Sequence, residues 1–130
     1  MAHIMLVDDQ IETLTLIRIM LERVGFTVSA AASAAAALDM IDQQKIAPPD
    51  LFLLDIAMPE VNGFELLKML KNRPTTRRAP VMMLTAVNDP DSVAEATALG
   101  AKDYLVKPVL ARVLVAKVRR CLPEARDIVH

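Results

Sequence analysis

Five short apolar segments recur along the chain, and a stretch with helical periodicity separates each from the next. The segments are His3 to Val7, Thr27 to Ala31, Leu51 to Leu54, Val81 to Leu84 and Asp103 to Val106. Because they read as nearly continuous apolar runs and not as alternating ones, they indicate strands that are covered on both faces. This pattern predicts a parallel sheet between two layers of helices.

The intervening stretches have the periodicity of amphipathic helices. In the first, apolar residues recur three or four positions apart and predict one buried stripe: Ile11, Leu14, Ile17 and Leu21. The five expected helices are Gln10 to Val24, Ser33 to about Lys45, Asn62 to Lys71, Ser92 to Leu99 and about Leu110 to Cys121. Strict alternation of strand and helix predicts right-handed βαβ units with helices on both faces of one sheet. The five-strand version, in the order 2-1-3-4-5, is the flavodoxin-like α/β fold.

The chain is long enough for one domain. Its 130 residues match a typical domain of roughly 100 to 150 residues. We expect the domain to cover residues 1 to 122, and residues 123 to 130 to be a C-terminal tail or the start of a linker. A single cysteine, Cys121, can form neither an internal disulfide nor a thiolate zinc cluster.

Charge and hydropathy restrict the partners. The chain has 15 Lys and Arg against 16 Asp and Glu, a net charge of −1, so it lacks the excess positive charge of general nucleic-acid binders. Its apolar stretches end well before the roughly 18 to 20 residues that a membrane span needs. We therefore expect a cytoplasmic protein that contacts neither nucleic acid nor membrane directly.

Polar residues with reactive or charged groups follow four of the five predicted strands: Asp8 and Asp9, then Asp55, then Thr85, then Lys107 with Pro108. The carboxyl ends of parallel strands meet at one edge of the sheet, where such folds bind ligands. Two carboxylates 4 Å apart repel each other by roughly 4 kcal/mol at an effective dielectric near 20. Three carboxylates and one lysine therefore predict a divalent cation, and oxygen ligands favour Mg²⁺, with Mn²⁺ as the alternative.

Such a site is suited to phosphoryl transfer, because Mg²⁺ commonly completes its shell with phosphate oxygens. Asp55 ends an apolar strand alone, whereas Asp8 and Asp9 form a chelating pair, so Asp55 is the better nucleophile. Its attack on phosphorus would give an acyl phosphate. Lys107 and the metal would stabilise the charge on the transferring oxygens, and the Thr85 hydroxyl would bind one of them.

These residues resemble the receiver domain of two-component response regulators over essentially the whole chain. The motifs are Asp8-Asp9, the run from Asp55 to Pro59 with Gly63, Thr85-Ala86 and Lys107-Pro108. The resemblance implies that Asp55 is the phosphoacceptor and that Mg²⁺ is held by Asp8 or Asp9, by Asp55 and by the main-chain carbonyl of Ala57. It implies that Thr85 and Lys107 contact the phosphoryl group and that the Lys107–Pro108 bond is cis.

The resemblance also implies partners and a switch. The donor would be a phosphohistidine on a sensor histidine kinase or a histidine phosphotransfer protein. Tyr104 falls where the family carries an aromatic side chain that turns inward when Thr85 moves toward the phosphoryl group. The face made by the fourth helix, fifth strand and fifth helix would then bind a downstream protein or a second copy. Ala57 and Val87 are apolar where the family varies beside the attacking water, which suggests slow self-dephosphorylation.

Other classes fit less well. A nucleotide or flavin binder would need a glycine-rich phosphate loop after the first strand, where this chain has Asp8 and Asp9. A metal-dependent phosphatase would need a second Asp two residues after the nucleophile, but position 57 is Ala. A receiver-like interaction module that works without phosphorylation stays the alternative to a phosphorylated switch. Taken singly, Asp8 with Asp9, Thr85 and Lys107 are also explained by a solvated turn, a helix cap or a solvated loop. Asp55 is harder to explain in this way, because an unpaired charge at the end of a buried apolar strand is costly.

Overall fold

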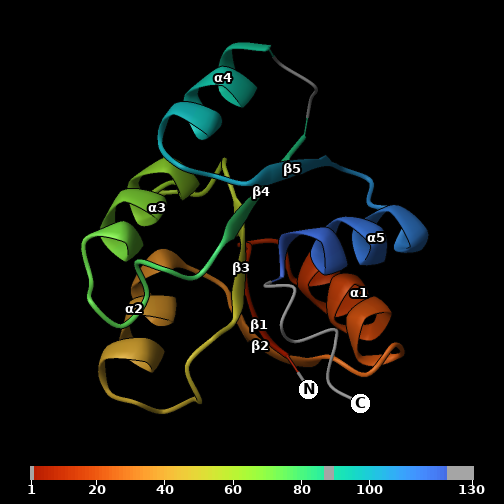
Figure 1. The fold of residues 1–130 in the computed structure, drawn as a ribbon, viewed down its shortest axis with the longest axis horizontal. Coiled ribbons are helices and arrows are strands. Elements are labelled where there is room, and N and C mark those ends of the chain that lie inside the picture. The colour runs from red at the N-terminus through yellow and green to blue at the C-terminus, as the bar shows by residue number, and fades with distance from the viewer. Residues whose placement is uncertain (1, 87–89, 123–130) are drawn as a thin grey trace.

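Five parallel strands form a single sheet in the computed structural model, which describes residues 2–86 and 90–122. The strands are β1 (His3–Val7), β2 (Thr27–Ala31), β3 (Leu51–Asp55), β4 (Val81–Thr85) and β5 (Asp103–Val106). The helices are α1 (Ile11–Glu22), α2 (Ala34–Asp42), α3 (Gly63–Lys71), α4 (Pro90–Ala98) and α5 (Ala111–Cys121). The strand order is β2-β1-β3-β4-β5, as the alternation of strand and helix predicted (Figure 1).

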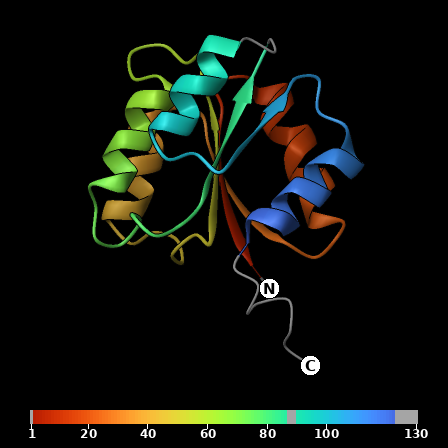
Figure 2. The ribbon, with the colours of Figure 1, turned by 45° about the horizontal axis from the view of Figure 1, so that its top comes forward.

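The helices cover both faces of the sheet (Figure 2). One face packs against α1 and α5, whose buried residues include Ile17 and Leu114. The other face packs against α2, α3 and α4, through residues such as Ala37, Leu67 and Ala96. Each central strand therefore sends alternate side chains into two separate cores, which explains the continuous apolar runs in the sequence.

The parallel register aligns the carboxyl ends of the strands. Val7 pairs with Leu54, and Thr85 pairs with Val106. The amide of Asp8 donates to the carbonyl of Ala31 at 3.1 Å. As a result, the residues that follow β1, β3, β4 and β5 emerge at one edge of the sheet.

The expected apolar stripe of α1 is only partly buried. Leu14, Ile17 and Leu21 lie in the core, but Ile11 is 60% exposed, so its placement among the buried residues was wrong. Ile11 is the first residue of the helix and follows the end of β1 by only four positions. Ile11 thus lies in the first turn of α1, close to the end of β1, and only Leu14 of that turn enters the core.

Helix α2 ends three residues before the expected Lys45. Gln44 adopts a left-handed conformation with φ 53°, and the amide of Lys45 donates to the carbonyl of Met40. A left-handed residue with such a hydrogen bond is a common way to end a helix, although glycine usually occupies the position. None of the helices that the structure describes combines the length and apolar character needed to cross a bilayer.

Candidate functional site

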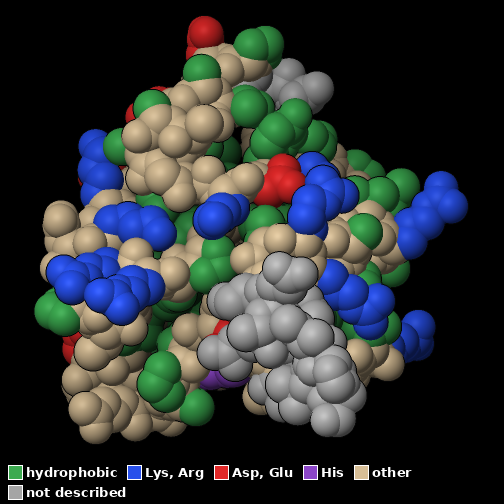
Figure 3. All heavy atoms as spheres, in the orientation of Figure 1, with side chains coloured by type: hydrophobic (Ala, Val, Ile, Leu, Met, Phe, Trp, Pro, Cys, Tyr) green, Lys and Arg blue, Asp and Glu red, His purple; other side chains and the backbone are tan. Residues whose placement is uncertain are grey.

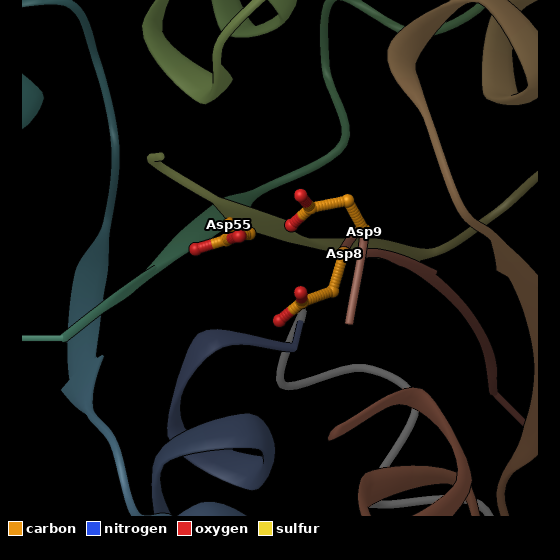
Figure 4. A group of neighbouring side chains, drawn as sticks. All are labelled: Asp8, Asp9 and Asp55. Carbon is orange, nitrogen blue, oxygen red and sulfur yellow. The ribbon is translucent and has the colours of Figure 1, made fainter. Parts of the chain in front are cut away.

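Three aspartates meet at the carboxyl edge of the sheet (Figure 4). Asp8 follows β1 and is fully buried, Asp55 ends β3 and is 4% exposed, and Asp9 is exposed. One carboxylate oxygen from each residue lies within 4.8 Å of the other two. The structure thus brings together three of the residues that the sequence analysis proposed as metal ligands.

Lys107 joins this cluster from the end of β5. Its Nζ lies 2.7 Å from Asp8 Oδ2 and 3.3 Å from Asp55 Oδ1. It also donates to Gln10 Oε1 at 3.2 Å. The other oxygen of Asp8 accepts a hydrogen bond from the amide of Gln10 at 2.9 Å. Both oxygens of the buried Asp8 carboxylate are therefore held in place, one by a cation and one by the backbone.

Gln10 was missed by sequence reasoning as a member of the site. Its side-chain oxygen accepts a hydrogen bond from the ammonium group of Lys107, and its backbone amide donates to the carboxylate of Asp8. The available signal was its position directly after the acidic pair, where the chain turns from β1 into α1.

Burial and charge shift the pKa values of this cluster. Burial, reinforced by the negative charge of Asp8, raises the pKa of Asp55 to about 6, although Lys107 opposes the shift. Burial alone would lower the pKa of Lys107, but its contact with Asp8 and the charge of Asp55 outweigh that effect, and its pKa is raised. Near neutral pH, Lys107 is therefore cationic and Asp55 is ionised but destabilised, which favours a cation or an electrophile beside it.

A close backbone contact positions the end of β3. Gly63, the first residue of α3, packs against the main chain of Asp55 and Ile56, and a Cβ atom there would lie 2.9 Å from Ile56 Cα. Its amide donates to the carbonyl of Ile56 at 2.9 Å. The helix start is fixed further by a capping box between Asn62 and Glu65. Glycine is therefore required at this position, because a side chain would collide with the main chain of Asp55 and Ile56. The start of α3 thus packs directly against the end of β3.

The connection between β3 and α3 carries Ala57, which is exposed. Its proposed role as a carbonyl ligand stays a prediction. Val87, the other residue proposed to affect phosphoryl lifetime, lies outside the described residues.

Thr85 lies at the same edge and is 6% exposed. Its carbonyl accepts a hydrogen bond from the amide of Lys107 at 2.8 Å, so the ends of β4 and β5 are tied together. The peptide bond between Lys107 and Pro108 is cis. Thr85 and Lys107 are thus brought to the edge that also holds the aspartates.

Tyr104 lies further back in β5, paired in register with Met83, and its ring is half-buried. Lys117 of α5 donates to the carbonyl of Tyr104 at 2.8 Å, and its Nζ lies 4.8 Å from the centre of the ring. This cation contact holds the ring toward α5. Tyr104 is therefore outside the aspartate cluster but on the face that the sequence analysis proposed for output.

The donor set suits a hard divalent cation. Asp8, Asp9 and Asp55 offer carboxylate oxygens alone, and among the described residues no His or Cys joins their cluster. His3 lies at the start of β1, where its Nε2 is 2.7 Å from Ser29 Oγ. Oxygen ligands favour Mg²⁺ or Mn²⁺ over zinc. The acidic cluster can therefore hold such a metal.

Comparisons with known proteins agree with this geometry. A family model for the response regulator receiver domain matches residues 4–119. The transcriptional regulatory protein CpxR of Escherichia coli K12 is 42% identical over 94% of the chain and 50% of its own length. The transcriptional regulatory protein AfsQ1 of Streptomyces coelicolor is 36% identical over 94% of the chain and 52% of its own length. The chain thus spans about half the length of these curated relatives.

A solved structure shows the same arrangement. The Vibrio cholerae chemotaxis protein CheY4 superposes with a TM-score of 0.86 at 33% identity, covering 94% of this chain and 99% of that protein. The likeness therefore extends over almost the whole of both chains.

Proposed function

This chain belongs to the family of response regulator receiver domains, the signalling switches of two-component systems, and we propose that it switches by accepting a phosphoryl group on Asp55. The observation that carries the proposal is the environment of that carboxylate. Asp55 is buried, its pKa is raised to about 6, and it lies 3.3 Å from the ammonium group of Lys107. An ionised carboxylate that is poorly solvated is a better nucleophile than one on the surface.

In the proposed step, an oxygen of Asp55 attacks the phosphorus of a phosphohistidine. The P–N bond breaks, its electron pair goes to the imidazole, and the product is an acyl phosphate on Asp55. Lys107 stays protonated and stabilises the charge on the phosphoryl oxygens. The Thr85 hydroxyl donates a hydrogen bond to one of those oxygens. The donor would be a sensor histidine kinase or a histidine phosphotransfer protein.

The acidic cluster would hold Mg²⁺, or Mn²⁺, through Asp8, Asp9, Asp55 and the main-chain carbonyl of Ala57. When bound, the ion supplies positive charge next to the transferring group. The chain's own part is to keep the oxygens close together, as the 4.8 Å limit on their separations supports. The buried Asp8, fixed by Gln10 and Lys107, would set the orientation of the whole cluster.

We propose that the signal leaves the site through Thr85 and Tyr104. Movement of Thr85 toward the phosphoryl group would make room for the Tyr104 ring, and the face of α4, β5 and α5 would change shape. A downstream protein or a second copy would bind there. The domain is a signalling switch and not a classical enzyme, so its only proposed catalysis is its own phosphorylation and dephosphorylation at Asp55.

The proposed receiver domain covers residues 1 to 122. Leu122 packs into the core beside α1 and α5 and is 6% exposed, which supports an end near this point. Residues 123 to 130, proposed as a tail or the start of a linker, lie outside the described residues. The cytoplasmic location and the lack of direct contact with nucleic acid stay predictions.

Phosphorylation of the isolated chain tests the proposal. The protein is incubated with Mg²⁺ and acetyl phosphate, and its intact mass is measured. We expect one added phosphoryl group on the wild type and none on Asp55→Asn. The matched control is Asp39→Asn, which changes an aspartate on α2 whose side chain is 44% exposed and pairs with Lys45. It should be phosphorylated normally. EDTA should abolish the addition.

The pH dependence gives a second readout. Because the pKa of Asp55 is raised to about 6, the initial rate should rise with pH through that value as the carboxylate ionises. Addition to Asp55→Asn, or equal addition with and without Mg²⁺, would contradict the proposed mechanism. No addition to the wild type would favour the phosphorylation-independent interaction module.

A further inference from the structure

A hollow lies at the opposite end of the sheet from the aspartates. Its volume is about 750 Å³, and it is bordered by the end of α2, the segment that leads into β3 and the loop after α3. We call it the rear hollow. Its lining residues are Ile41, Asp42, Gln44, Lys45, Ile46, Ala47, Pro48, Pro49, Thr75 and Thr76. Five residues, 50–54, separate its lining residue Pro49 from Asp55, which is about 16 Å of extended chain.

The walls of the rear hollow are tied together by side chains. Arg73 and Asp42 form a bidentate ion pair, in which Nε donates to Oδ1 and Nη2 donates to Oδ2, both at 2.9 Å. The hydroxyl of the buried Thr76 donates to the carbonyl of Leu70 at 2.7 Å. Pro48 and Pro49 restrict the facing wall. The hollow is thus largely preformed, and a ligand would lose little affinity to ordering it.

The floor and one wall of the rear hollow are apolar. Ile41 and Ile46 are partly buried and pack against the core on the α2 and α3 side of the sheet. Ala47, Pro48 and Pro49 extend this apolar surface along the segment before β3. A recess of this kind accommodates apolar side chains of a ligand better than a flat patch does.

The border of the rear hollow is basic. Between Lys68 and Arg78 the chain has five Lys or Arg and no acidic residue. Two of them are engaged: Arg73 pairs with Asp42, and Lys71 Nζ donates to the carbonyls of Arg77 and Ala79. Figure 3 shows Lys and Arg side chains gathered over α3 and the loop that follows it, on the left of the view.

Arg77 and Arg78 directly follow Thr76 of the hollow wall, and both are exposed. Within the described part of the chain, the side chains of Arg77 and Arg78 have no ion pair. Lys102 adds positive charge nearby, and burial together with that charge holds the pKa of Lys71 below its ordinary value. Among the residues that the structure describes, none neutralises the positive charge of Arg77 and Arg78 through an ion pair.

We propose that the rear hollow is a docking site for an extended segment of another protein, one that carries carboxylates beside one or two apolar side chains. The apolar side chains would enter the recess, and the carboxylates would pair with Arg77 and Arg78. This assignment does not depend on phosphorylation of Asp55, because the two sites lie at opposite ends of the sheet.

Two other polyanions fit this surface less well. Single-stranded nucleic acid binds through stacking on aromatic side chains, and none of the described residues that line the hollow is aromatic. An anionic membrane would need large apolar side chains that project beside the cations. Among the residues that the structure describes, the large exposed apolar side chains are instead on α1, in the turn after it and around the start of α5: Ile11, Leu16, Ile19, Val24, Leu110 and Val113. A recessed apolar surface with a basic border is better matched by a peptide.

The test selects short random peptides, displayed on phage, on immobilised wild-type protein. Enriched peptides are then synthesised and their affinity is measured by fluorescence anisotropy. We expect enrichment of peptides that combine Asp or Glu with Leu, Ile or Phe. The double variant Arg77→Gln/Arg78→Gln should bind them about tenfold more weakly, because it removes two exposed ion pairs that each contribute a few-fold to the affinity.

The matched control is Arg119→Gln/Arg120→Gln, which removes two consecutive, exposed arginines from the last turn of α5. It should bind the peptides like the wild type. Ala47→Trp, which fills the hollow without changing charge, should weaken binding while circular dichroism shows an intact fold. Asp55→Asn should bind normally, so this test stays separate from that of the proposed phosphorylation.

Three results would overturn the assignment. One is the absence of enriched peptides that bind the hollow. Another is equal weakening by the two double arginine variants, which would show a general charge effect. The third is binding of a single-stranded oligonucleotide or of anionic vesicles, lost in Arg77→Gln/Arg78→Gln, with no peptide binding.

Discussion

Lys107 Nζ contacts Asp8 Oδ2 at 2.7 Å, and its distance to Asp55 Oδ1 is longer, at 3.3 Å. Asp8 is fully buried, whereas Lys107 is partly buried. The lysine is therefore primarily the counter-ion of Asp8, and it only partly neutralises Asp55. Burial, reinforced by the negative charge of Asp8, raises the pKa of Asp55, and Lys107 opposes only part of that shift.

Removing the charge of Asp55 should therefore stabilise the fold in metal-free buffer. The pKa of Asp55 is about 6 in the folded chain, against an ordinary value of 3.8. The folded state thus binds a proton more tightly than the unfolded state, and this group's contribution to stability falls as the pH rises from about 4 to about 6. At pH 7, Asp55→Asn should raise the free energy of unfolding by an amount on the order of 1 kcal/mol.

The measurement is urea unfolding, followed by circular dichroism in EDTA, at several pH values. The gain from Asp55→Asn should disappear below about pH 4, where Asp55 is protonated in both states. The control variant Asp39→Asn should show no comparable gain in the free energy of unfolding. If Asp55→Asn is less stable than the wild type at pH 7, the negative charge of Asp55 is fully stabilised by its neighbours in the folded state, and the prediction is wrong.

Magnesium affinity should depend on Asp9 without a cost to the fold. Asp9 is exposed but supplies one of the three clustered oxygens. Asp9→Asn should therefore weaken Mg²⁺ binding about tenfold, because affinity follows the charge count of the ligands. Asp8→Asn should weaken it as well and also lower the melting temperature in EDTA, because Lys107 would lose its closer counter-ion.

Isothermal titration calorimetry measures the affinity, and thermal unfolding in EDTA measures the fold. The control is Glu12→Gln, which removes an exposed acid from the first turn of α1 but not from the cluster. It should leave the Mg²⁺ affinity unchanged. Equal affinities for Asp9→Asn and wild type would remove Asp9 from the proposed ligand set.

Gly63 should be needed for the position of Asp55. A methyl group there would collide with the main chain of Asp55 and Ile56, which cannot move without shifting the end of β3. Gly63→Ala should lower the free energy of unfolding by about 1 to 3 kcal/mol and slow phosphorylation by acetyl phosphate. Asn62→Ala, which removes the capping box next to it, should cost about 1 kcal/mol and leave the phosphorylation rate unchanged.

The two variants distinguish a loss of stability from a displacement of Asp55. Both should destabilise the start of α3, but only Gly63→Ala should displace the main chain of Asp55. Mass spectrometry over time gives the rate, and urea unfolding gives the stability. Equal rates for Gly63→Ala and Asn62→Ala would show that Asp55 tolerates the displacement.

The sequence predicted the fold closely because its apolar runs report a sheet buried on both faces. All five strands were located, and two of them, β3 and β4, extend one residue further to include Asp55 and Thr85. The helix ends were less accurate. They depend on local backbone conformations, such as the left-handed Gln44 that ends α2, and apolar periodicity carries no information about those conformations.

Part of the site could also be predicted, because strand order alone places Asp8, Asp55 and Lys107 at one edge. The unequal sharing of Lys107 between the two aspartates could not be predicted, since it depends on differences of less than an ångström. The role of Gln10 could not be predicted either, because its backbone amide binds Asp8 while its side chain binds Lys107. The rear hollow was missed because it is formed by two stretches, residues 41–49 and 75–76, that are far apart in sequence and have no shared motif.

The proposed switch can be followed through the chain's own fluorescence. The sequence has one tyrosine and no tryptophan, so the emission reports on Tyr104 alone. Its half-buried ring contacts the ammonium group of Lys117. If phosphorylation of Asp55 turns the ring inward, that cation contact is lost and the emission changes. We therefore expect a change when acetyl phosphate and Mg²⁺ are added together to the wild type.

Asp55→Asn should show no such change, and neither should wild type with Mg²⁺ alone. Lys117→Met keeps an unbranched apolar side chain but removes the cation, so its starting emission should already differ from that of the wild type and should respond less to the phosphodonor. A phosphorylated wild type, verified by mass, whose Tyr104 emission is unchanged would show that the ring keeps its contact with α5. The output signal would then leave Asp55 by a route that does not involve Tyr104.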